Sequence, residues 1–177
     1  MGIDDRAMIW GVDHKLALGK NDAFKQGLTI VKWNNVYSNH GTTHDTFCVD
    51  TDFFLFRVAE AYLNAAEAEM HLNGANSDKA KGWIDALRDR AHAEKHSFYT
   101  LNDVLDERAR ELYCEGLRRT DLIRFNQYGG NKATYKWELK GGSDNGANFD
   151  KTKNVYPLPS SEILANKNLT QIDGYNE

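Results

Sequence analysis

The sequence predicts a mainly α-helical protein with long irregular loops and little β-structure. Three stretches repeat apolar or charged residues at intervals of three and four, the spacing that places side chains on one face of a helix. Only residues 28–33 have the run of β-branched and apolar side chains typical of a strand. Polar segments that contain glycine separate these stretches and predict loops.

The first two predicted helices form a pair. One covers residues 53–72 and stops at Asn73 and Gly74, and the next runs from an N-cap at Ser77 to about Ala91. The apolar face of the first consists of Leu55, Val58, Ala59, Tyr62, Ala66 and Met70. That of the second consists of Ala80, Trp83, Ile84, Leu87 and Ala91. The pair resembles one tetratricopeptide unit, which buries its face on neighbouring structure.

The third predicted helix is rich in charge. Thr100 and Asp103 form a capping box that opens it. Over residues 105–124, charged side chains stand three and four positions apart, where neighbours on a helix can pair, and Gly116 divides the stretch into two helical pieces. Apolar residues are interleaved with these charges, so we expect several charges to be tied into neighbouring structure. The predicted structural ion network consists of Arg108, Glu111, Glu115, Arg118 and Asp121.

The remaining sequence is mostly loop. Residues 126–154 form a long segment rich in glycine, with an aromatic patch at residues 135–137. Loops of this length are uncommon in compact domains unless they are functional or mobile. Residues 156–163 then predict an extended entry followed by a short capped helix.

The composition is that of one ordinary globular domain of 177 residues, 41% hydrophobic and 27% charged. A net charge of -4 gives no basic surface for nucleic acid, so no nucleic-acid partner is expected. No apolar run is long enough to span a bilayer, and the first residues lack the apolar core of a secretory leader. Cys48 and Cys114 are expected to be free thiols, with one of them, Cys114, buried among apolar neighbours; a disulfide between the two is the alternative.

Residues 107–124 resemble the signature helix of the SusD/RagB family of outer-membrane nutrient-binding lipoproteins. The family pattern is E-R-x-x-E-L-x-x-E-G-x-R-x-x-D-L-x-R, and every fixed position is filled here: Glu107, Arg108, Glu111, Leu112, Glu115, Gly116, Arg118, Asp121, Leu122 and Arg124. Residues 52–68 match a second family signature, D-F-x-L-F-R-x-A-E-x-Y-L-x-x-A-E-A, and residues 84–91 match I-x-x-x-R-x-R-A. Residues 166–175 resemble the family's terminal N-P-x-L-x-Q-N-P-G-Y, although neither proline is present.

This resemblance implies a non-catalytic protein that captures oligosaccharide or another nutrient at the cell surface, on the outer membrane, for a TonB-dependent outer-membrane transporter. Family members begin with a lipoprotein signal and are much longer, so the chain is expected to be the C-terminal portion of such a protein. Residues 53–177 would form the SusD/RagB-like C-terminal domain, and residues 1–52 an irregular lead-in that is part of a ligand-side loop region. The alternative is a tetratricopeptide-like scaffold that binds a protein or peptide partner.

Three groups of residues have some of the chemistry of catalytic or metal sites. The paired glutamates of the third helix stand beside arginines that would keep them ionised, whereas a glycosidase needs one protonated carboxyl. His40, His44 and Cys48 are four positions apart, which aligns ligands only on a helix, so a solvated loop is favoured over a zinc site. Residues 144–150 depart from the EF-hand order. We therefore expect no enzyme, no cofactor and no metal.

Sugar capture requires flat apolar faces and hydrogen-bonding groups in a groove. The aromatic residues outside the predicted core faces are the candidates for ligand contact: Trp10, Trp33, Tyr37, Tyr135 and Trp137. Burial in a core or an interface is the alternative interpretation of each, and no motif marks a ligand site.

Overall fold

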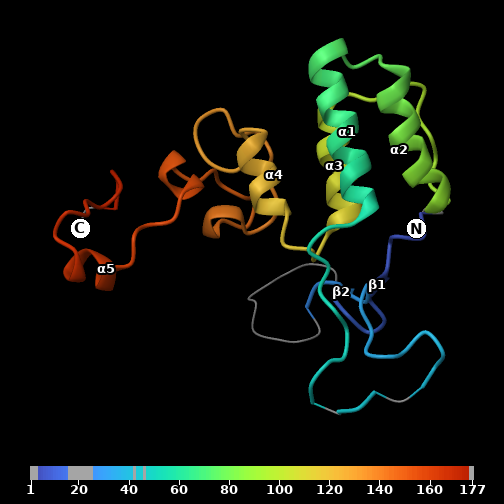
Figure 1. Ribbon diagram of the computed structural model, residues 1–177, viewed down its shortest axis with the longest axis horizontal. Helices are drawn as coiled ribbons and strands as arrows, with labels where there is room; N and C mark the ends of the chain where they lie inside the picture. The colour runs from blue at the N-terminus through green and yellow to red at the C-terminus, as the bar shows by residue number, and fades with distance from the viewer. Residues whose placement is uncertain (1–3, 16–25, 42, 46, 176–177) are drawn as a thin grey trace. The chain divides into compact units, whose positions relative to one another are not determined.

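The computed structural model describes residues 4–15, 26–41, 43–45 and 47–175, and the chain divides into two compact units, Met1–Glu115 and Gly116–Glu177. The regular secondary structure of the described residues is mainly helical, with one small sheet of two short strands (Figure 1). The prediction of a mainly α-helical fold with little β-structure is therefore confirmed. The expected domain division after residue 52 stays a prediction.

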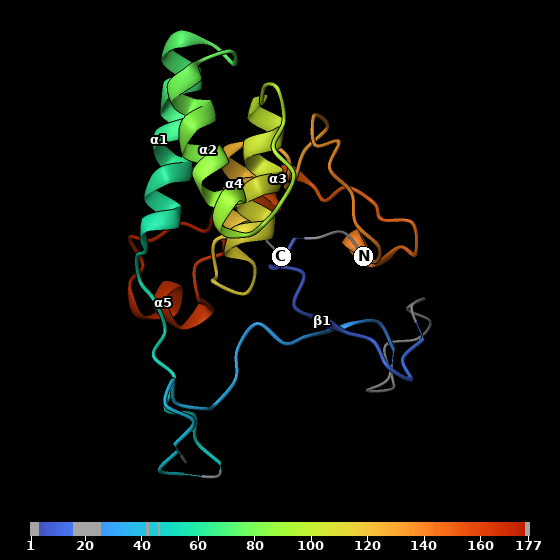
Figure 2. The ribbon, with the colours of Figure 1, turned by 90° about the vertical axis from the view of Figure 1, so that its right-hand side faces the viewer.

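Three helices build the core of the first unit: α1 (Val58–Asn73), α2 (Asp78–Arg90) and α3 (Leu101–Leu112). Helix α1 packs against both α2 and α3, and α1 and α2 lie side by side in Figures 1 and 2. From the predicted apolar faces, the core buries Ala59, Ala66, Met70, Ala80, Ile84 and Leu87, and α3 adds Val104, Leu105 and Leu112. Leu63, which was not predicted to face the core, is fully buried, whereas Val58 of the predicted face is 68% exposed. Burial of apolar side chains is the main favourable contribution to folding.

Helix α1 begins five residues later than predicted, so the expected start at residue 53 is wrong. Arg57 is the N-cap and has an extended backbone, with φ -150° and ψ 159°. Leu55, which belongs to the predicted apolar face, and the adjacent Phe56 are 79% and 87% exposed. The extended conformation lets the Arg57 side chain reach two carboxylates of α3, and these ion pairs outweigh the local helical pattern.

The starts of α2 and α3 follow their predicted capping residues, whereas the short helix Ser160–Ala165, which was predicted to be capped, has no side-chain cap. The Ser77 side chain accepts a hydrogen bond from the backbone of Ala80 at the start of α2. The Thr100 hydroxyl accepts from the backbone N–H of Asp103 at 3.2 Å, and the Asp103 carboxylate accepts from that of Thr100 at 2.7 Å, so the predicted capping box is confirmed. Gly116, with φ +78°, lies between α3 and α4 (Arg118–Arg124), as the predicted division into two helical pieces requires.

The sheet is smaller than predicted. Strands β1 (Ile9–Trp10) and β2 (Thr29–Ile30) pair antiparallel, with Ile9 opposite Ile30. The strand expected over residues 28–33 is therefore reduced to two residues. Beyond β2 the chain turns so that the Lys32 ammonium reaches backbone carbonyls at the end of α3.

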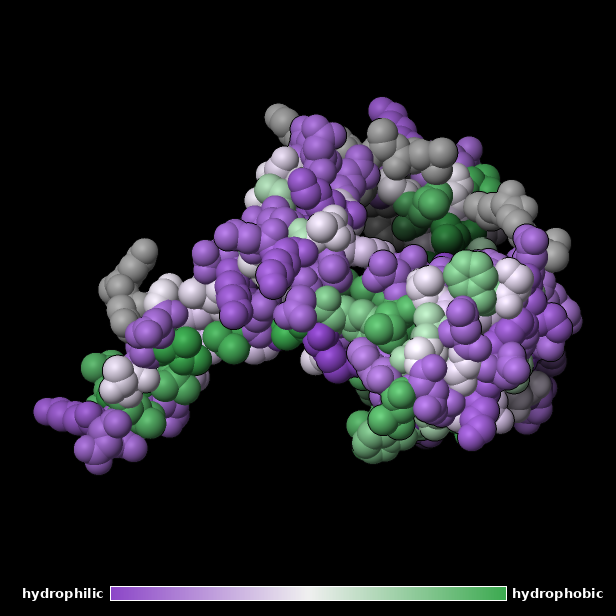
Figure 3. Space-filling view, turned by 90° about the horizontal axis from the view of Figure 1, so that it is seen from above, coloured by the Kyte–Doolittle hydropathy of each residue, from purple (hydrophilic) through white to green (hydrophobic). Residues whose placement is uncertain are grey.

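The second unit consists of α4, a structured loop, and α5 (Ser160–Ala165). The loop contains two 3-10 turns, η1 (Lys140–Gly142) and η2 (Lys151–Asn154). The buried ammonium of Lys140 donates to the carbonyls of Gln127 and Tyr135, at 3.2 and 2.6 Å, and so connects separate parts of the loop. In Figure 3, apolar residues gather over the segment that carries α5.

Both cysteines are free, as expected, but the predicted burial of Cys114 is wrong. Cys114 lies in the turn after α3 with φ +61°, outside the helix, and its side chain is exposed. In the described part of the chain, no helix combines the length and apolar character needed to cross a bilayer.

Candidate functional site

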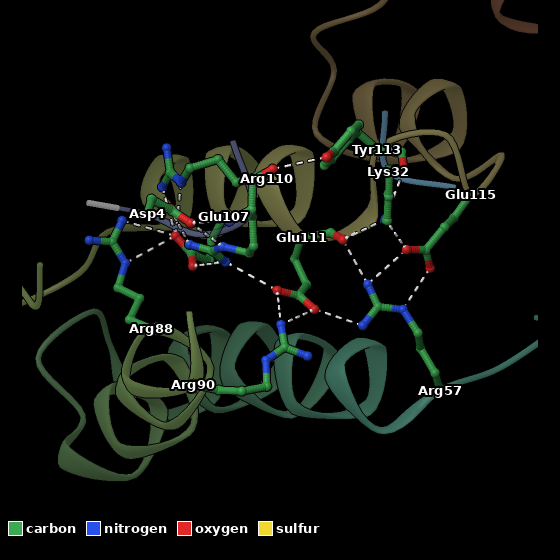
Figure 4. Close-up of polar contacts among 11 residues, drawn as sticks. Asp4, Lys32, Arg57, Arg88, Arg90, Glu107, Arg110, Glu111, Tyr113 and Glu115 are labelled. Carbon is green, nitrogen blue, oxygen red and sulfur yellow. Dashed lines mark hydrogen bonds and ion pairs between the residues drawn. The ribbon is translucent and has the colours of Figure 1, made fainter. Parts of the chain in front are cut away.

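Three glutamates lie along one face of α3 and at its end, and we call them the α3 carboxylate cluster: Glu107, Glu111 and Glu115. Their spacing of four residues aligns them on one side of a helix. Glu107 and Glu111 are 1% and 3% exposed, and Glu115 is 8% exposed. Figure 4 shows basic side chains from several segments converging on them.

Glu111 receives three arginines from three parts of the first unit. Arg57 and Arg90 each donate to its carboxylate at 2.7 Å, and Arg6 donates at 3.1 Å. Arg57 precedes α1, Arg90 is the last residue of α2, and Arg6 belongs to the segment before β1. One carboxylate thus connects both neighbouring helices and the N-terminal segment to α3 (Figure 4).

Glu107 is held in the same way. Arg6 donates to it at 2.7 Å, Arg88 of α2 at 2.9 Å, and Arg110 of α3 at 2.7 Å. The contact with Arg110 is the three-residue helical pairing that the sequence predicts. The other two arginines come from distant parts of the chain.

Glu115 stands where α3 has ended. Arg57 donates to its two oxygens at 2.7 and 2.8 Å, and Lys32 forms an ion pair with it. The Lys32 ammonium also donates to the carbonyls of Glu111 and Tyr113, at 3.1 and 3.0 Å, which satisfies carbonyls left open by the helix end.

These contacts decide the protonation state of the cluster. Burial acts to raise the pKa of Glu111, but hydrogen bonds from Arg57 and Arg90 outweigh it and hold that pKa below its ordinary value. The pKa values of Glu107 and Glu115 are lowered for the same reason, by Arg6 and Arg57 above all. An ionised carboxylate with its oxygens occupied is a poor proton donor, so the cluster braces the fold.

The other members of the predicted ion network lie elsewhere. Arg108 is buried and donates to the Asn64 side chain of α1 at 2.7 Å. Arg118 lies over a tyrosine ring of the second unit, 4.8 Å from its centroid. Asp121 is buried in α4 and accepts from Arg124 at 3.0 Å. Sequence reasoning missed the partners of the cluster that come from other segments: Arg6, Lys32, Arg57, Arg88 and Arg90.

Trp33 lines two hollows of the first unit. One, of about 380 Å³, lies beside the α3 carboxylate cluster and is also lined by Met8, Phe54 and Arg90. The second, of about 290 Å³, is called the Trp33 hollow; its lining consists of Trp33, Asn34, Asn35, Val49, Thr51, Asp52, Phe53 and Cys114. Trp33 is 40% exposed and its ring packs at a tilt on Phe54, with centroids 5.5 Å apart. The Trp33 hollow therefore combines an open aromatic face with amide, hydroxyl and carboxyl groups.

Trp10 and Tyr37, the other candidates in the first unit, line neither hollow. Trp10 lies in β1 with an exposed side chain. Tyr37 donates to Asp50 at 2.6 Å, and this bond lowers the pKa of Asp50 and raises that of Tyr37. His44 also contacts Asp50, at 2.9 Å, and nowhere in the described residues do three or more His, Cys, Asp or Glu side chains form a group that could hold a metal ion.

Tyr135 and Trp137 are the only pair of candidates that the structure shows in ring contact, within the described residues. Their centroids are 6.4 Å apart, and Trp137 meets the edge of Phe149 at 6.0 Å. Phe149 in turn packs on Tyr128 at 5.0 Å, so four rings form a continuous series in the second unit. The buried Lys140 ammonium lies 4.7 Å from the centroid of Trp137, which assigns that tryptophan a structural contact as well.

The last ring of this series borders a hollow of about 370 Å³ in the second unit, which we call the Arg119 hollow. It is lined by Arg119, Tyr128, Phe149, Lys153, Val155, Tyr156 and Tyr175. Sequence reasoning missed this site, because its lining comes from α4, the loop, η2 and the C-terminal segment, and no spacing rule connects them.

Comparisons with known proteins by family, by sequence and by structure agree on one family. The model of the SusD family matches residues 13–175. The starch-binding protein SusD of Bacteroides thetaiotaomicron is 41% identical over 97% of this chain, and the chain spans 31% of that protein. The structure of the surface glycan-binding protein A of the same organism, in complex with laminarihexaose, is 26% identical with a TM-score of 0.56, over 70% of this chain and 25% of that one.

A SusD superfamily protein from Parabacteroides distasonis shares the fold over 99% of this chain and 40% of its own, with a TM-score of 0.69 at 22% identity. The chain thus spans about a third of the length of the curated relative that it matches, and less than half of each of these structures.

Proposed function

This chain belongs to the SusD family, and from that membership we propose that it is part of a glycan-binding protein without catalytic activity of its own. The observation that carries the proposal is the 41% identity to a starch-binding protein, since binding is the activity that the relative's name records. The glycan-binding neighbour in complex with laminarihexaose supports the same class of ligand. The ionised state of the α3 carboxylate cluster supports the absence of hydrolysis by these residues.

On this chain, we propose the Trp33 hollow as the place of sugar contact. A sugar ring presents an apolar face that packs on an aromatic side chain, and its hydroxyls require donors and acceptors at the rim. Trp33 offers the partly open ring, and the side chains of Asn34, Thr51 and Asp52 offer the polar groups. A volume of about 290 Å³ suits one or two sugar residues.

Titration calorimetry of the chain with maltohexaose and laminarihexaose tests this proposal. We expect Trp33→Ala to weaken binding about tenfold or more, because a central aromatic contact is commonly worth more than 1 kcal/mol. Trp10→Ala is the matched control, since Trp10 is also exposed but lines neither hollow. Equal affinities for the two variants, or no binding of either sugar by the unaltered chain, would contradict the proposal.

We further propose that the full protein acts at the cell surface, on the outer membrane, and passes its ligand to a TonB-dependent transporter. Family membership supports this step. The exposed apolar residues ahead of α1, including Leu55 and Phe56, supply a surface of the kind that protein partners cover. Purification of the protein from outer membranes tests the proposal. We expect a TonB-dependent transporter to accompany it, and consistent recovery without one would oppose the proposal.

A further inference from the structure

The Arg119 hollow has a charge character unlike the rest of the chain. Two of its lining residues, Arg119 and Lys153, are cations, and none is an acid, in a chain whose net charge is -4. The other lining residues are four aromatic side chains and a valine. A partly open aromatic site whose only charged lining residues are cations favours an anionic ligand with an apolar face.

Arg119 is held in place by its surroundings. Its guanidinium lies over two rings, 4.1 Å from the centroid of Tyr156 and 5.1 Å from that of Tyr128. One nitrogen, Nη2, donates to the carbonyls of Lys153 and Asn154 at 3.0 and 3.2 Å. These contacts fix the orientation of the cation without neutralising its charge, because carbonyl oxygens carry only partial charges.

Lys153 supplies the second positive charge at an exposed position of η2. Its ammonium lies 4.9 Å from the ring centroid of Tyr175 and makes no direct hydrogen bond to a carboxylate in the described residues, although, after the hydrogen bonds from Thr152, its charge contributes to the lowered pKa of Asp150. The nearby Asp150 carboxylate does not line the hollow; it accepts hydrogen bonds from the backbone and hydroxyl of Thr152, both at 2.9 Å. Lys153 therefore remains available to a ligand.

Among the rings of the hollow, the Tyr156 ring is the one that offers an open platform, since Tyr128 and Phe149 pack on each other. Tyr156 is 70% exposed even though the Arg119 guanidinium lies over its ring. The Tyr175 hydroxyl donates to the carbonyls of Thr152 and Val155 at 3.2 and 3.1 Å, which fixes that ring at the rim. An exposed tyrosine that is positioned by an arginine is suited to stack on one face of a flat or ring-shaped ligand.

We propose that the Arg119 hollow binds a sugar residue that carries an anionic group, either a carboxylate or a sulfate. The sugar ring packs on Tyr156, and the anionic group pairs with Lys153 and the free nitrogens of Arg119. The inference rests on the proposed glycan binding and names the ligand class of a second contact, separate from the Trp33 hollow. A volume of about 370 Å³ accommodates one such residue with its substituent.

Titration calorimetry of the full chain with three probes tests the inference: trigalacturonate, the same trisaccharide with every carboxylate methyl-esterified, and a sulfated carrageenan oligosaccharide. We expect at least one anionic probe to bind about tenfold more tightly than the ester, since a charge-assisted hydrogen bond is commonly worth more than 1.4 kcal/mol. Added salt should weaken this binding, because it screens exposed charges. Preference for the first probe identifies a carboxylate ligand, and preference for the third identifies a sulfate ligand.

Lys153→Gln is the decisive variant, and Lys167→Gln is its control. Both remove one exposed positive charge from the second unit, but only Lys153 lines the hollow. We expect Lys153→Gln to weaken binding of the preferred anionic probe about tenfold and Lys167→Gln to leave it unchanged. Tyr156→Ala should weaken the same probe, since it removes the platform. Equal binding of the ester and both anionic probes, or equal affinities for the two lysine variants, overturns the inference.

The same experiment in a Trp33→Ala background separates this inference from the proposed function. Anionic binding that depends on Lys153 and persists in that background supports the Arg119 hollow even if the unaltered chain binds neither maltohexaose nor laminarihexaose. Binding of those neutral sugars that depends on Trp33, without any preference for an anionic probe, sustains the Trp33 hollow and overturns the inference drawn here.

Discussion

The α3 carboxylate cluster and the Arg119 hollow both gather charged groups, yet they leave their charges in opposite states. In the cluster, three buried glutamates form ion pairs with five basic residues that lie outside α3 and with a sixth, Arg110, within it. In the hollow, Arg119 and Lys153 face aromatic rings, and no acid is among the lining residues. In the cluster, each negative charge is paired with basic side chains of the protein. In the hollow, the positive charges are not paired with a lining acid and can pair with a ligand.

This difference distinguishes a structural role for the α3 carboxylate cluster from a binding role for the Arg119 hollow. A buried carboxylate is costly to desolvate, so it persists only with complete pairing, and a completely paired group has nothing left to offer a ligand. An exposed cation on a ring costs little to maintain and can still accept an anion. Substitutions in the cluster should therefore change stability, and loss of the exposed Lys153 charge in the hollow should change binding.

The largest effect is expected for Glu111→Gln. The amide keeps the shape of the side chain but removes the charge that Arg6, Arg57 and Arg90 share, and leaves these arginines partly unpaired in a buried site. Loss of one partner of a buried pair costs about 3–5 kcal/mol, and we expect about 3 kcal/mol because glutamine retains some hydrogen bonds. Urea denaturation measures the change in the free energy of unfolding.

Glu94→Gln is the matched control for that experiment. Its side chain is exposed, so the same chemical change should alter stability by less than about 0.5 kcal/mol. If Glu111→Gln were no more destabilising than Glu94→Gln, the cluster would not brace the first unit, and its assignment as structural would be wrong.

The second largest effect is expected from acid, which should lower the free energy of unfolding by protonating the same cluster. The arginines lower the pKa values of Glu107, Glu111 and Glu115 below the ordinary value of 4.5, despite burial. A carboxylate with a lower pKa in the folded state stabilises that state above its unfolded pKa, and the contribution is lost as the pH falls through the folded pKa. We expect the free energy of unfolding to decline from about pH 4.5 downward.

Urea midpoints at a series of pH values between neutral and acid measure this decline. The decline should be shallower in Glu111→Gln, which has one such carboxylate fewer. Identical slopes for the variant and the unaltered chain would show that acid acts through other groups, such as the paired Asp4.

The sequence predicted the helices well because their signals are local. The capping box of Thr100 and Asp103, the stop at Gly74 and the break at Gly116 depend on backbone groups within a few residues. The start of α1 was predicted wrongly for the opposite reason. Arg57 is extended because of its ion pairs with residues more than fifty positions away, and no local pattern records them.

The candidate site was predictable only in part for the same reason. Aromatic residues outside the core faces could be selected by elimination, and Trp33, Tyr135 and Trp137 do lie at hollows or in a ring series. The Arg119 hollow was missed, because Tyr156 and Tyr175 lie more than thirty residues beyond Arg119 and acquire their role only when the loop folds back. Charge pairing and cavity lining are properties of tertiary structure.

A moderate effect is expected for Arg119→Lys, which keeps the charge of the hollow but removes the planar fork. The lysine ammonium is not planar, so it cannot cover the Tyr128 and Tyr156 rings as the guanidinium does while it donates to two carbonyls. We expect a loss of about 1 kcal/mol in the second unit, seen as faster hydrogen exchange over residues 126–156. Unchanged exchange there would show that the guanidinium geometry does not order this region.

The smallest effect on stability is expected for Lys153→Gln. Its ammonium is exposed and contacts one ring, so the free energy of unfolding should change by less than about 0.5 kcal/mol. The same variant is expected to lose binding of an anionic sugar, whereas Glu111→Gln destabilises the first unit and leaves the lining of the Arg119 hollow intact. Melting curves and calorimetry on both variants measure the two properties together. If Lys153→Gln lowered stability as strongly as Glu111→Gln, Lys153 would have a structural role like that of the basic residues around the α3 carboxylate cluster. Its charge would then not be available to a ligand.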